Sequence, residues 1–150
     1  MGQIAIPATG LIYLDTQILI YSVERHPHFA PALQPLWDAV QSRHATVVMS
    51  KFSILECLVV PLRTGDTEAT TRFNTLFASG ALQLEEVSEE VLRYAAKLRA
   101  DTPSLRGPDS IHAATAFSCR TDSFLTNDRV FDKLALPGLT QLSRVSFELQ

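Results

Sequence analysis

The sequence predicts an α/β protein in which helices cover both faces of a mostly parallel sheet of four to five strands. Two kinds of segment, which alternate along the chain, favour this fold class. Short apolar runs rich in β-branched and aromatic residues alternate along the chain with longer segments whose apolar residues recur at helical spacing. Alternation of this kind is typical of a parallel sheet, because a helix must carry the chain back between two parallel strands. The expected architecture is therefore a three-layer α/β/α sandwich.

Length and composition fit a single domain. The chain has 150 residues, 46% of them hydrophobic, and no segment is of low complexity. A domain of this size buries roughly 70% of the surface that its unfolded chain exposes, which is enough to build a core. We place the domain at residues 11–143 and treat residues 1–10 and 144–150 as terminal extensions.

The first predicted strand covers residues 11–14, which read LIYL, and Asp15 follows it directly. A short helix over 18–23 and an amphipathic helix over 31–43 come next, followed by a second strand over 46–49. An acid directly after a buried strand is well placed to stand at an edge of the sheet.

After the second strand, Ser50 is expected to cap a helix over 51–63, and Gly65 is expected to close it. An acid, Glu56, lies among the apolar residues of this helix. Because burial of a carboxylate without a partner is costly, Glu56 is either a functional residue or a side chain at the edge of the face with its carboxylate in water. The residues that predict the buried face are Phe52, Leu55, Val59 and Leu62.

Two further helices surround a third predicted strand. Asp66 is expected to cap a helix that continues to Ser79, and residues 81–85 alternate as a strand does. Ser88 is expected to cap the helix that follows. The inner face of this helix is predicted to contain Val91, Ala95 and Leu98.

The segment 105–117, LRGPDSIHAATAF, predicts a helix that holds an acid at its start. Gly107 interrupts the preceding segment, and Pro108 is suited to the first helical position because its φ is already set. Asp109 then falls in the first turn, where the helix dipole favours a negative charge. The alternative to a functional role for Asp109 is a structural one, in which its negative charge only complements the helix dipole.

A fourth strand is predicted over 123–126 and a fifth over 139–142, with a brief helix over 128–134 between them. In a parallel sheet the carboxyl ends of the strands lie at one edge, which is the usual place for chemistry. Asp128, like Asp15, follows a strand, whereas Glu56 and Asp109 lie on helices. We therefore expect four carboxylates to converge at this edge.

Four converging carboxylates point to a divalent cation. Like charges repel unless cations intervene, and Mg2+ and Mn2+ prefer oxygen ligands. Such ions activate water and neutralise charge that develops on a phosphodiester. The net charge of −3 excludes a general basic surface for nucleic acid, but a bound metal supplies a local positive field.

Targeting and cysteine usage favour a cytoplasmic protein without a membrane span. The N-terminal segment has no basic start with a long apolar run, and no stretch approaches the ~20 apolar residues of a transmembrane helix. Two cysteines, Cys57 and Cys119, are expected to fill core volume in a reducing compartment.

In chain order, four segments resemble the PIN domain and, more closely, are similar to the VapC-type toxins of bacterial toxin–antitoxin pairs. The resemblance runs from about residue 11 to 142 and implies a PIN-like sandwich. It further implies a Mg2+- or Mn2+-dependent endoribonuclease, a homodimer, and inhibition by a small antitoxin protein. The four segments are LDTQILIY at 14–21, SKFSILEC at 50–57, GPDSIHAATA at 107–116 and FLTNDRVFDKL at 124–134.

By this resemblance, Asp15, Glu56, Asp109 and Asp128 are the catalytic and metal-binding acids. Thr126 matches a hydroxyl position that supports the site. Family members often have Asn two residues after the first acid, where this chain has Gln17, so the longer arm alters a contact to metal-bound water or substrate.

Other polar residues near these motifs have more than one interpretation each. His112 either hydrogen-bonds a site carboxylate, touches RNA, or packs between helices with a satisfied ring, and the last is the commoner case for a lone histidine. Arg129, Lys133 and Lys51 are candidates for phosphate contacts, with solvated surface charge as the alternative.

Three competing functions are weighed against the nuclease. An aspartyl-phosphate phosphatase would require a second acid two residues after Asp15, but the residue at that position is Gln17. A receiver domain would want neighbouring acids at the first strand and a lysine after a later strand, and neither is evident. A catalytically impaired PIN-like module that binds RNA or protein stays open, because Gln17 departs from the family pattern.

Overall fold

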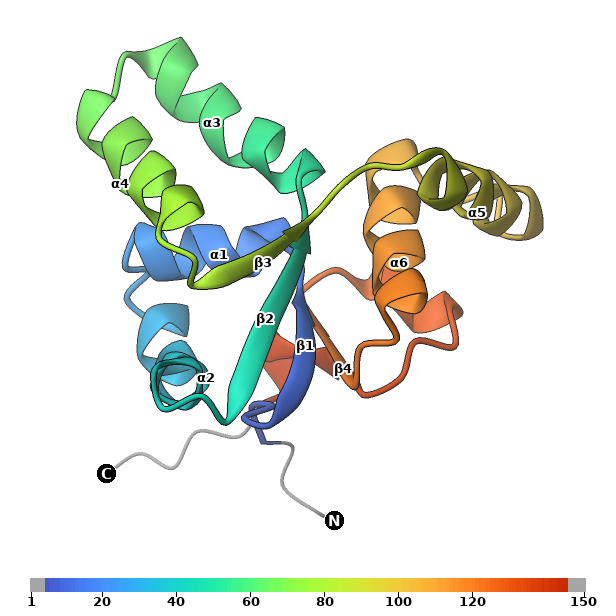
Figure 1. The fold of residues 1–150 in the computed structure, drawn as a ribbon, viewed down its shortest axis with the longest axis horizontal. Coiled ribbons are helices and arrows are strands. Elements are labelled where there is room, and N and C mark those ends of the chain that lie inside the picture. The colour runs from blue at the N-terminus through green and yellow to red at the C-terminus, as the bar shows by residue number, and fades with distance from the viewer. Residues whose placement is uncertain (1–4, 146–150) are drawn as a thin grey trace.

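A computed structural model describes residues 5–145, and its five strands form one parallel sheet in the order β3-β2-β1-β4-β5. Helices cover both faces of this sheet (Figure 1), so the predicted α/β/α sandwich is confirmed. No helix within residues 5–145 is long and apolar enough to cross a membrane. The elements are β1 (Gly10–Leu14), α1 (Thr16–Val23), α2 (Phe29–Gln41), β2 (Ala45–Ser50), α3 (Phe52–Thr64), α4 (Thr67–Ala78), β3 (Leu82–Glu85), α5 (Glu89–Asp101), α6 (Gly107–Cys119), β4 (Ser123–Thr126), the 3-10 helix η1 (Arg129–Lys133), β5 (Leu139–Gln141) and the 3-10 helix η2 (Leu142–Arg144).

The central strand β1 divides the core into two parts. Its side chains alternate across the sheet, as the two-residue period of a strand requires. Ile12 and Leu14 pack into a core with α1 and α2, whereas Tyr13 packs into a core with α6 and η1. All three side chains are fully buried. The apolar run LIYL is thus explained by a strand that is covered on both faces.

The carboxyl ends of β1 and β4 lie side by side, and this positions the site. Leu14 pairs with Leu125 in the parallel register, and the amide of Asp15 donates to the Leu125 carbonyl at 3.0 Å. Asp15 therefore stands at the end of one strand, beside Thr126 at the end of the next.

Helix α1 begins at Thr16, so the predicted start at residue 18 is two residues late. The reason is that Asp15 caps the helix. Its backbone is extended (φ −65°, ψ 144°), and its Oδ1 accepts a hydrogen bond from the Thr16 amide at 2.9 Å. The acid that ends the strand is also the residue that begins the helix.

Three other boundaries shift by small amounts. Helix α2 covers residues 29–41 instead of 31–43. The brief helix predicted over 128–134 is the 3-10 helix η1. Pro108 is the second helical residue of α6, because Gly107 already has helical geometry. The N-cap of α3 is Lys51, while the hydroxyl of the predicted cap, Ser50, accepts from the Phe52 amide at 3.1 Å. The caps predicted at Asp66 and Ser88 are confirmed.

The predicted buried face of α3 is wrong. Leu55, Val59 and Leu62 are 59%, 41% and 65% exposed, and Phe52 is half-buried. The buried residues of α3 are instead the small Ser53, Cys57 and Pro61. Figure 1 shows the reason: α3 and α4 form a pair that extends past the strand ends, so only a narrow side of α3 meets the rest of the fold. Hydrophobic spacing alone does not tell which side that is.

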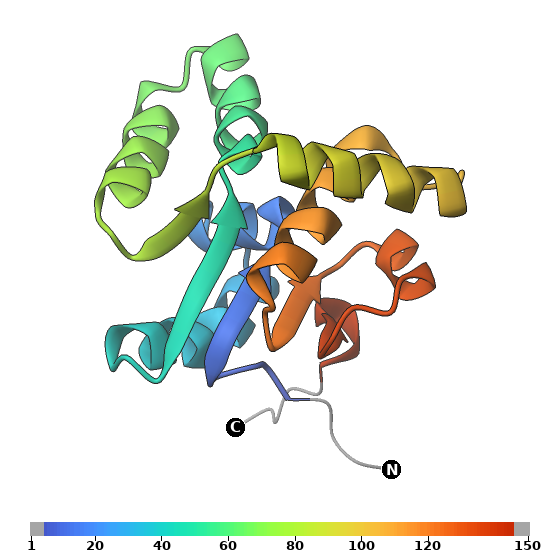
Figure 2. The same cartoon turned by 45° about the vertical axis from the view of Figure 1, so that its right-hand side comes forward.

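Helix α6 packs closely because its buried residues are small. Ala113 and Ala116 contact the sheet side, and Ala114 contacts α5. Figure 2 shows α5 lying across α6, on the side away from the sheet. This close approach keeps the first turn of α6, with Asp109, at the strand ends.

The packing of α6 predicts a strong response to added volume. Ala113→Leu should lower the free energy of unfolding by about 1–3 kcal/mol, because Ala113 is fully buried and the larger side chain must displace its neighbours. Urea unfolding measures the difference. Ala100→Leu, on the exposed side of α5, is the matched control and should stay within about 0.5 kcal/mol of the parent. Equal stability of the two variants would contradict the close packing.

Candidate active site

The four acids singled out in the sequence line one pocket, with a volume of about 230 Å³, at the carboxyl ends of β1 and β4. Each comes from a different part of the chain: the end of β1, the middle of α3, the first turn of α6 and the segment after β4. Parallel strands and the helices that follow them bring these positions to one edge. The acids are Asp15, Glu56, Asp109 and Asp128, and the pocket is completed by Thr16, Gln17, Ile20 and Arg106.

Asp15 is the most firmly held of these carboxylates. Its Oδ1 accepts from the Thr16 amide, and its Oδ2 accepts from the Thr126 hydroxyl at 2.7 Å. Thr126 Oγ1 in turn accepts from the amide of Asp128 at 3.0 Å. Burial raises the pKa of Asp15, and the nearby His112 and the Thr126 hydrogen bond only partly oppose that rise.

Glu56 has one oxygen engaged by the protein. The hydroxyl of Thr16 lies 2.9 Å from Glu56 Oε1, and His112 Nε2 lies 2.6 Å from the same atom. Within residues 5–145, Oε2 accepts no hydrogen bond. Burial alone would raise the pKa of Glu56, but its hydrogen bonds and charge interaction with His112 outweigh burial and lower it. Glu56 is therefore held ionised, with one oxygen left for a ligand.

His112 links the acid pocket to the sheet. Its side chain is 1% exposed; Nε2 donates to Glu56, and Nδ1 lies 2.6 Å from the Tyr13 hydroxyl. The Tyr13 oxygen also accepts from the Ser50 amide at 3.1 Å. Burial lowers the pKa of His112, but the hydrogen bond to Glu56 and the surrounding acids more than offset this and raise it. The structure contains two of the sequence interpretations together: His112 is a buried ring with both nitrogens satisfied, and one of its partners is a site carboxylate.

Asp109 and Asp128 are the acids of the pocket with the fewest protein contacts. Burial and the charges of Asp128 and Asp15 raise the pKa of Asp109, although Arg106 Nε lies 3.6 Å from its Oδ2. Asp128 is exposed, and its Oδ1 accepts from the Val130 amide at 2.9 Å to start η1. Asp15 and Glu56 each accept two hydrogen bonds through their side chains.

The donor set suits a hard divalent cation. All four acids offer carboxylate oxygen, and positive charge would relieve the repulsion from Asp128 and Asp15 that, after burial, raises the pKa of Asp109. As the side chains stand, no three Asp, Glu, His or Cys residues in the described part of the chain are grouped closely enough to enclose an ion.

The other candidates named from the sequence divide into two groups. Gln17 is exposed at the rim of the acid pocket, and Arg129 lines an adjoining pocket. Lys51 instead pairs with Glu86, and Lys133 Nζ donates to Ser104 at 2.8 Å, so neither lines the acid pocket.

The sequence did not single out five of the residues that line the two pockets. Thr16, Ile20 and Arg106 line the acid pocket, and Tyr21 and Asn127 line the adjoining one. Arg106 directly precedes the GPD motif, and Asn127 directly precedes Asp128. Adjacency to a candidate acid was thus the available signal for these two. Tyr21 had no such signal, since it reaches the pocket from the second turn of α1.

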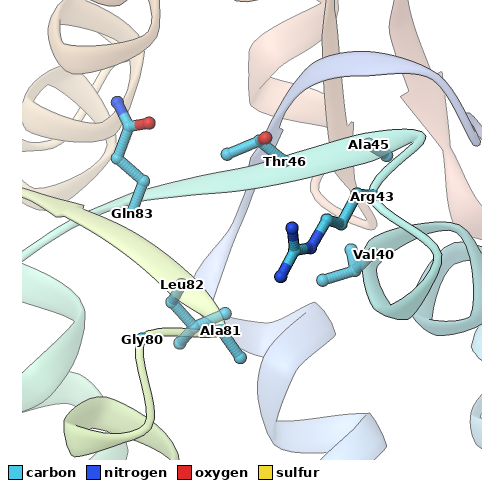
Figure 3. Close-up of a pocket in the computed structure, with 8 residues that line it drawn as sticks. All are labelled: Val40, Arg43, Ala45, Thr46, Gly80, Ala81, Leu82 and Gln83. Carbon is cyan, nitrogen blue, oxygen red and sulfur yellow. The ribbon is translucent and has the colours of Figure 1, made fainter.

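A roomier pocket of about 470 Å³ lies at the opposite edge of the sheet, where β2 and β3 begin. Figure 3 shows its polar side chains, Arg43, Thr46 and Gln83, around an otherwise apolar wall. None of the residues that line it is an acid or a histidine. We therefore locate the chemistry in the smaller acid pocket.

A parallel α/β sandwich with an acidic pocket at its strand ends defines the class of this protein. The chain belongs to the PIN domain family, whose model matches residues 12–136. No curated protein matches the sequence.

Several solved structures share the fold at low sequence identity. The chain is similar to VapBC2 from Rickettsia felis bound to a promoter DNA fragment, with a TM-score of 0.69, 17% identity, and coverage of 87% of this chain and 98% of that one. It is similar to Mycobacterium tuberculosis VapC20, described as a sarcin-ricin loop cleaving toxin (TM-score 0.68, 16% identity, 85% and 97% coverage). A toxin–antitoxin complex from Klebsiella pneumoniae gives a TM-score of 0.64 at 21% identity, with 87% and 97% coverage.

The raised pKa of His112 predicts a pH dependence of stability. The folded state binds the His112 proton more tightly than the unfolded chain, whose value is near the ordinary 6.5. The stabilisation that the His112 proton gives to the folded state is complete below the unfolded pKa, and it is lost as the pH rises through the folded pKa. The free energy of unfolding should therefore fall as the pH rises above about 6.5.

Urea titrations across this pH range measure the effect. His112→Gln should remove the fall with pH, and should also lower stability by about 1–3 kcal/mol because the Tyr13 hydroxyl and Glu56 lose a buried partner. His44→Gln, at an exposed histidine, should keep the parent profile. Parallel profiles for parent and His112→Gln would contradict the assignment.

Proposed function

We propose that this protein is a metal-dependent endoribonuclease that hydrolyses RNA phosphodiester bonds, and that it is the toxin of a toxin–antitoxin pair. The observation that carries the proposal is the acid pocket, in which four carboxylates from four segments of a PIN domain meet. The similarity of the fold to toxin structures, one of them described as cleaving the sarcin-ricin loop, supports it.

Mg2+ or Mn2+ is the proposed cofactor, held by Asp15, Glu56, Asp109 and Asp128. When bound, such an ion supplies an activated water and neutralises charge developing on the phosphate. The protein contributes the position of the ligands. Thr126 and the Thr16 amide fix Asp15, while His112 and Thr16 fix Glu56 with one oxygen turned to the pocket. These hydrogen-bond donors preorganise the charged site.

Direct contact between His112 and RNA is not part of the proposal. The ring is 1% exposed and both of its nitrogens have partners inside the protein. The basic residues at the pocket are Arg106 and, next to it, Arg129. We assign to these two the contacts with RNA phosphates, which position a substrate without reading its sequence.

An antitoxin protein and a second copy of the chain are the proposed protein partners. Exposed apolar side chains on α3 and α5 provide surface that such contacts would cover. They include Leu55, Val60 and Leu62 of α3, and Leu92 and Tyr94 of α5. The solved toxin–antitoxin complexes with this fold support the antitoxin assignment.

Aspartyl-phosphate chemistry is disfavoured because the residue two positions after Asp15 is Gln17, and not the second acid that this chemistry uses. The impaired binding module differs from the nuclease only in lacking turnover, and a cleavage assay separates the two.

Cleavage of total cellular RNA by the purified, antitoxin-free protein tests the proposed activity. Discrete fragments should form with Mg2+ or Mn2+ and disappear with chelator. Asp109→Asn should keep the fold and reduce the rate by more than the roughly 10–100-fold that loss of an outer metal partner costs. Asp101→Asn, at the end of α5, is the matched control and should cleave normally. Cleavage by Asp109→Asn at the parent rate would show the site to be wrong, and no cleavage by the folded parent would favour the binding module.

Metal binding should also appear as stabilisation, independent of RNA. At a concentration of about 100 times the Kd, Mn2+ should add about 2.7 kcal/mol to the free energy of unfolding. Asp109→Asn should be at least as stable as the parent without metal, since it removes a charge that Asp128 and Asp15 repel, but should gain little from Mn2+. Thermal melts with and without chelator measure both effects. An equal gain in both proteins would place the cation elsewhere.

A further inference from the structure

A second pocket, with a volume of about 420 Å³, opens directly beside the acid pocket. The two share three lining residues, Asp15, Gln17 and Asp128. The remaining walls of the second pocket come from Tyr21, Asn127 and Arg129. A group bound there would thus touch the same carboxylates that we assign to the metal.

One wall of this second pocket is aromatic. Tyr21 is half-buried, and its ring packs against Phe29 (4.7 Å between centroids) and His26 (5.1 Å). These neighbours hold the phenol ring in place at the pocket. A ring fixed by other rings loses little entropy when a planar group stacks on it, which favours nucleobases over flexible ligands.

Asn127 adds an oriented hydrogen-bonding group. Its Oδ1 accepts from the Ser143 amide at 3.0 Å, which assigns the side-chain oxygen to that side. The amide nitrogen, Nδ2, then lies 3.5 Å from the Tyr21 hydroxyl, at the pocket. That distance is at the limit of a hydrogen bond, so the NH2 group retains donor capacity for a ligand.

Two further groups at this pocket have no competing partner among the described residues. The Gln17 side chain is exposed and forms no hydrogen bond within residues 5–145, and Arg129 forms no ion pair there. Gln17 offers an amide that both donates and accepts, and Arg129 offers a fixed positive charge. Side chains of this kind can bind a ligand without first breaking an internal contact.

We infer that this second pocket is a nucleotide subsite, which takes one nucleotide of single-stranded RNA next to the bond that is cleaved. The base would lie against Tyr21 and meet the amides of Asn127 and Gln17, while Arg129 would meet an adjacent phosphate. A volume of about 420 Å³ is within the range of small-ligand sites and accommodates one nucleotide. The inference rests on the proposed function and adds which residues set the preference for a base at the cut.

The arrangement favours RNA over a peptide at this place. Amides beside an aromatic ring match the hydrogen-bonding edges and the flat face of a base. The acid pocket alone repels a polyanion, and the chain has a net charge of −3, so a cation beside the acids is needed to bring phosphate near. Arg129 is placed to do this.

Binding of a labelled ten-nucleotide RNA of random sequence tests the subsite without relying on turnover. The Asp109→Asn protein serves as the parent, and fluorescence anisotropy gives the Kd as a function of salt. Arg129→Gln should raise the Kd about tenfold and lower the salt slope by about 0.7, the value for one phosphate contact on a single strand. Arg93→Gln, an exposed arginine on α5, removes the same charge and should change neither.

The aromatic and amide walls are tested by paired variants of the same protein. Tyr21→Leu should raise the Kd about tenfold, whereas Tyr21→Phe keeps the ring and should stay within about threefold, since stacking supplies most of the affinity. Asn127→Asp keeps the acceptor that Ser143 uses but replaces the NH2 donor, and should also weaken binding. Circular dichroism melts confirm that each variant is folded.

In the cleavage-competent protein, the same changes should raise KM more than they lower kcat, and Tyr21→Leu and Asn127→Asp should alter the bases found next to the cut. Unchanged Kd, salt slope and cut-site preference would overturn the subsite. Loss of antitoxin affinity with RNA binding intact would overturn it as well, and would make the pocket a protein-docking surface.

The two proposals fail in different ways. If the unmutated protein cleaves RNA but its pocket variants bind and cut RNA as it does, the subsite is wrong and the nuclease stands. If the unmutated protein cleaves nothing, yet the pocket variants lose RNA binding as described, the nuclease is wrong and the pocket is an RNA-binding site without a cleaved bond beside it.

Discussion

The hydrogen bond from the Thr126 hydroxyl to the Asp15 carboxylate joins the ends of the two adjacent strands around which the site is built. At 2.7 Å it crosses the β1–β4 pair at the point where both strands stop. The other oxygen of Asp15 caps α1, and the Thr126 oxygen accepts the amide that leads into η1. One carboxylate therefore ends a strand, begins a helix and forms the floor of the pocket. The positions of Gln17 and Tyr21 on α1 follow from that cap.

A cluster of acids is unfavourable for folding, and the buried polar residues beneath it offset part of that cost. The Ser50 amide, the Tyr13 hydroxyl, the His112 ring and the Glu56 carboxylate form a continuous hydrogen-bonded chain from β2 to the pocket. Its members are buried or half-buried, where hydrogen bonds are strong and an unpaired group is costly. The chain keeps Glu56 ionised and fixed. Asp109 and Asp128 have fewer partners: Arg106 lies 3.6 Å from Asp109, and the Val130 amide donates to Asp128.

The division of α3 into two faces shows how one helix serves both core and surface. Its small residues Ser53 and Cys57 face inward, beside Glu56, and leave room for the Thr16 hydroxyl between α1 and α3. Four larger apolar residues of α3 are exposed instead: Leu55, Val59, Val60 and Leu62. A bulky inward face would push α3 outward and separate Glu56 from Thr16. The apolar side of α3 is thus exposed because the small residues of the helix face α1, where Glu56 reaches Thr16.

The sequence by itself determined the fold class, the order of strands and helices, and the four acids that share the pocket. These depend on local periodicity, on caps such as Asp66 and Ser88, and on the rule that parallel strands end at one edge. Only the tertiary structure decided the buried side of α3 and the contact of His112 with Glu56. It alone placed Arg106 and Tyr21 at the site. Each of these depends on how a helix is rotated about its axis and how closely it approaches its neighbours. Contacts between residues far apart in the chain set both quantities, and no local pattern records them.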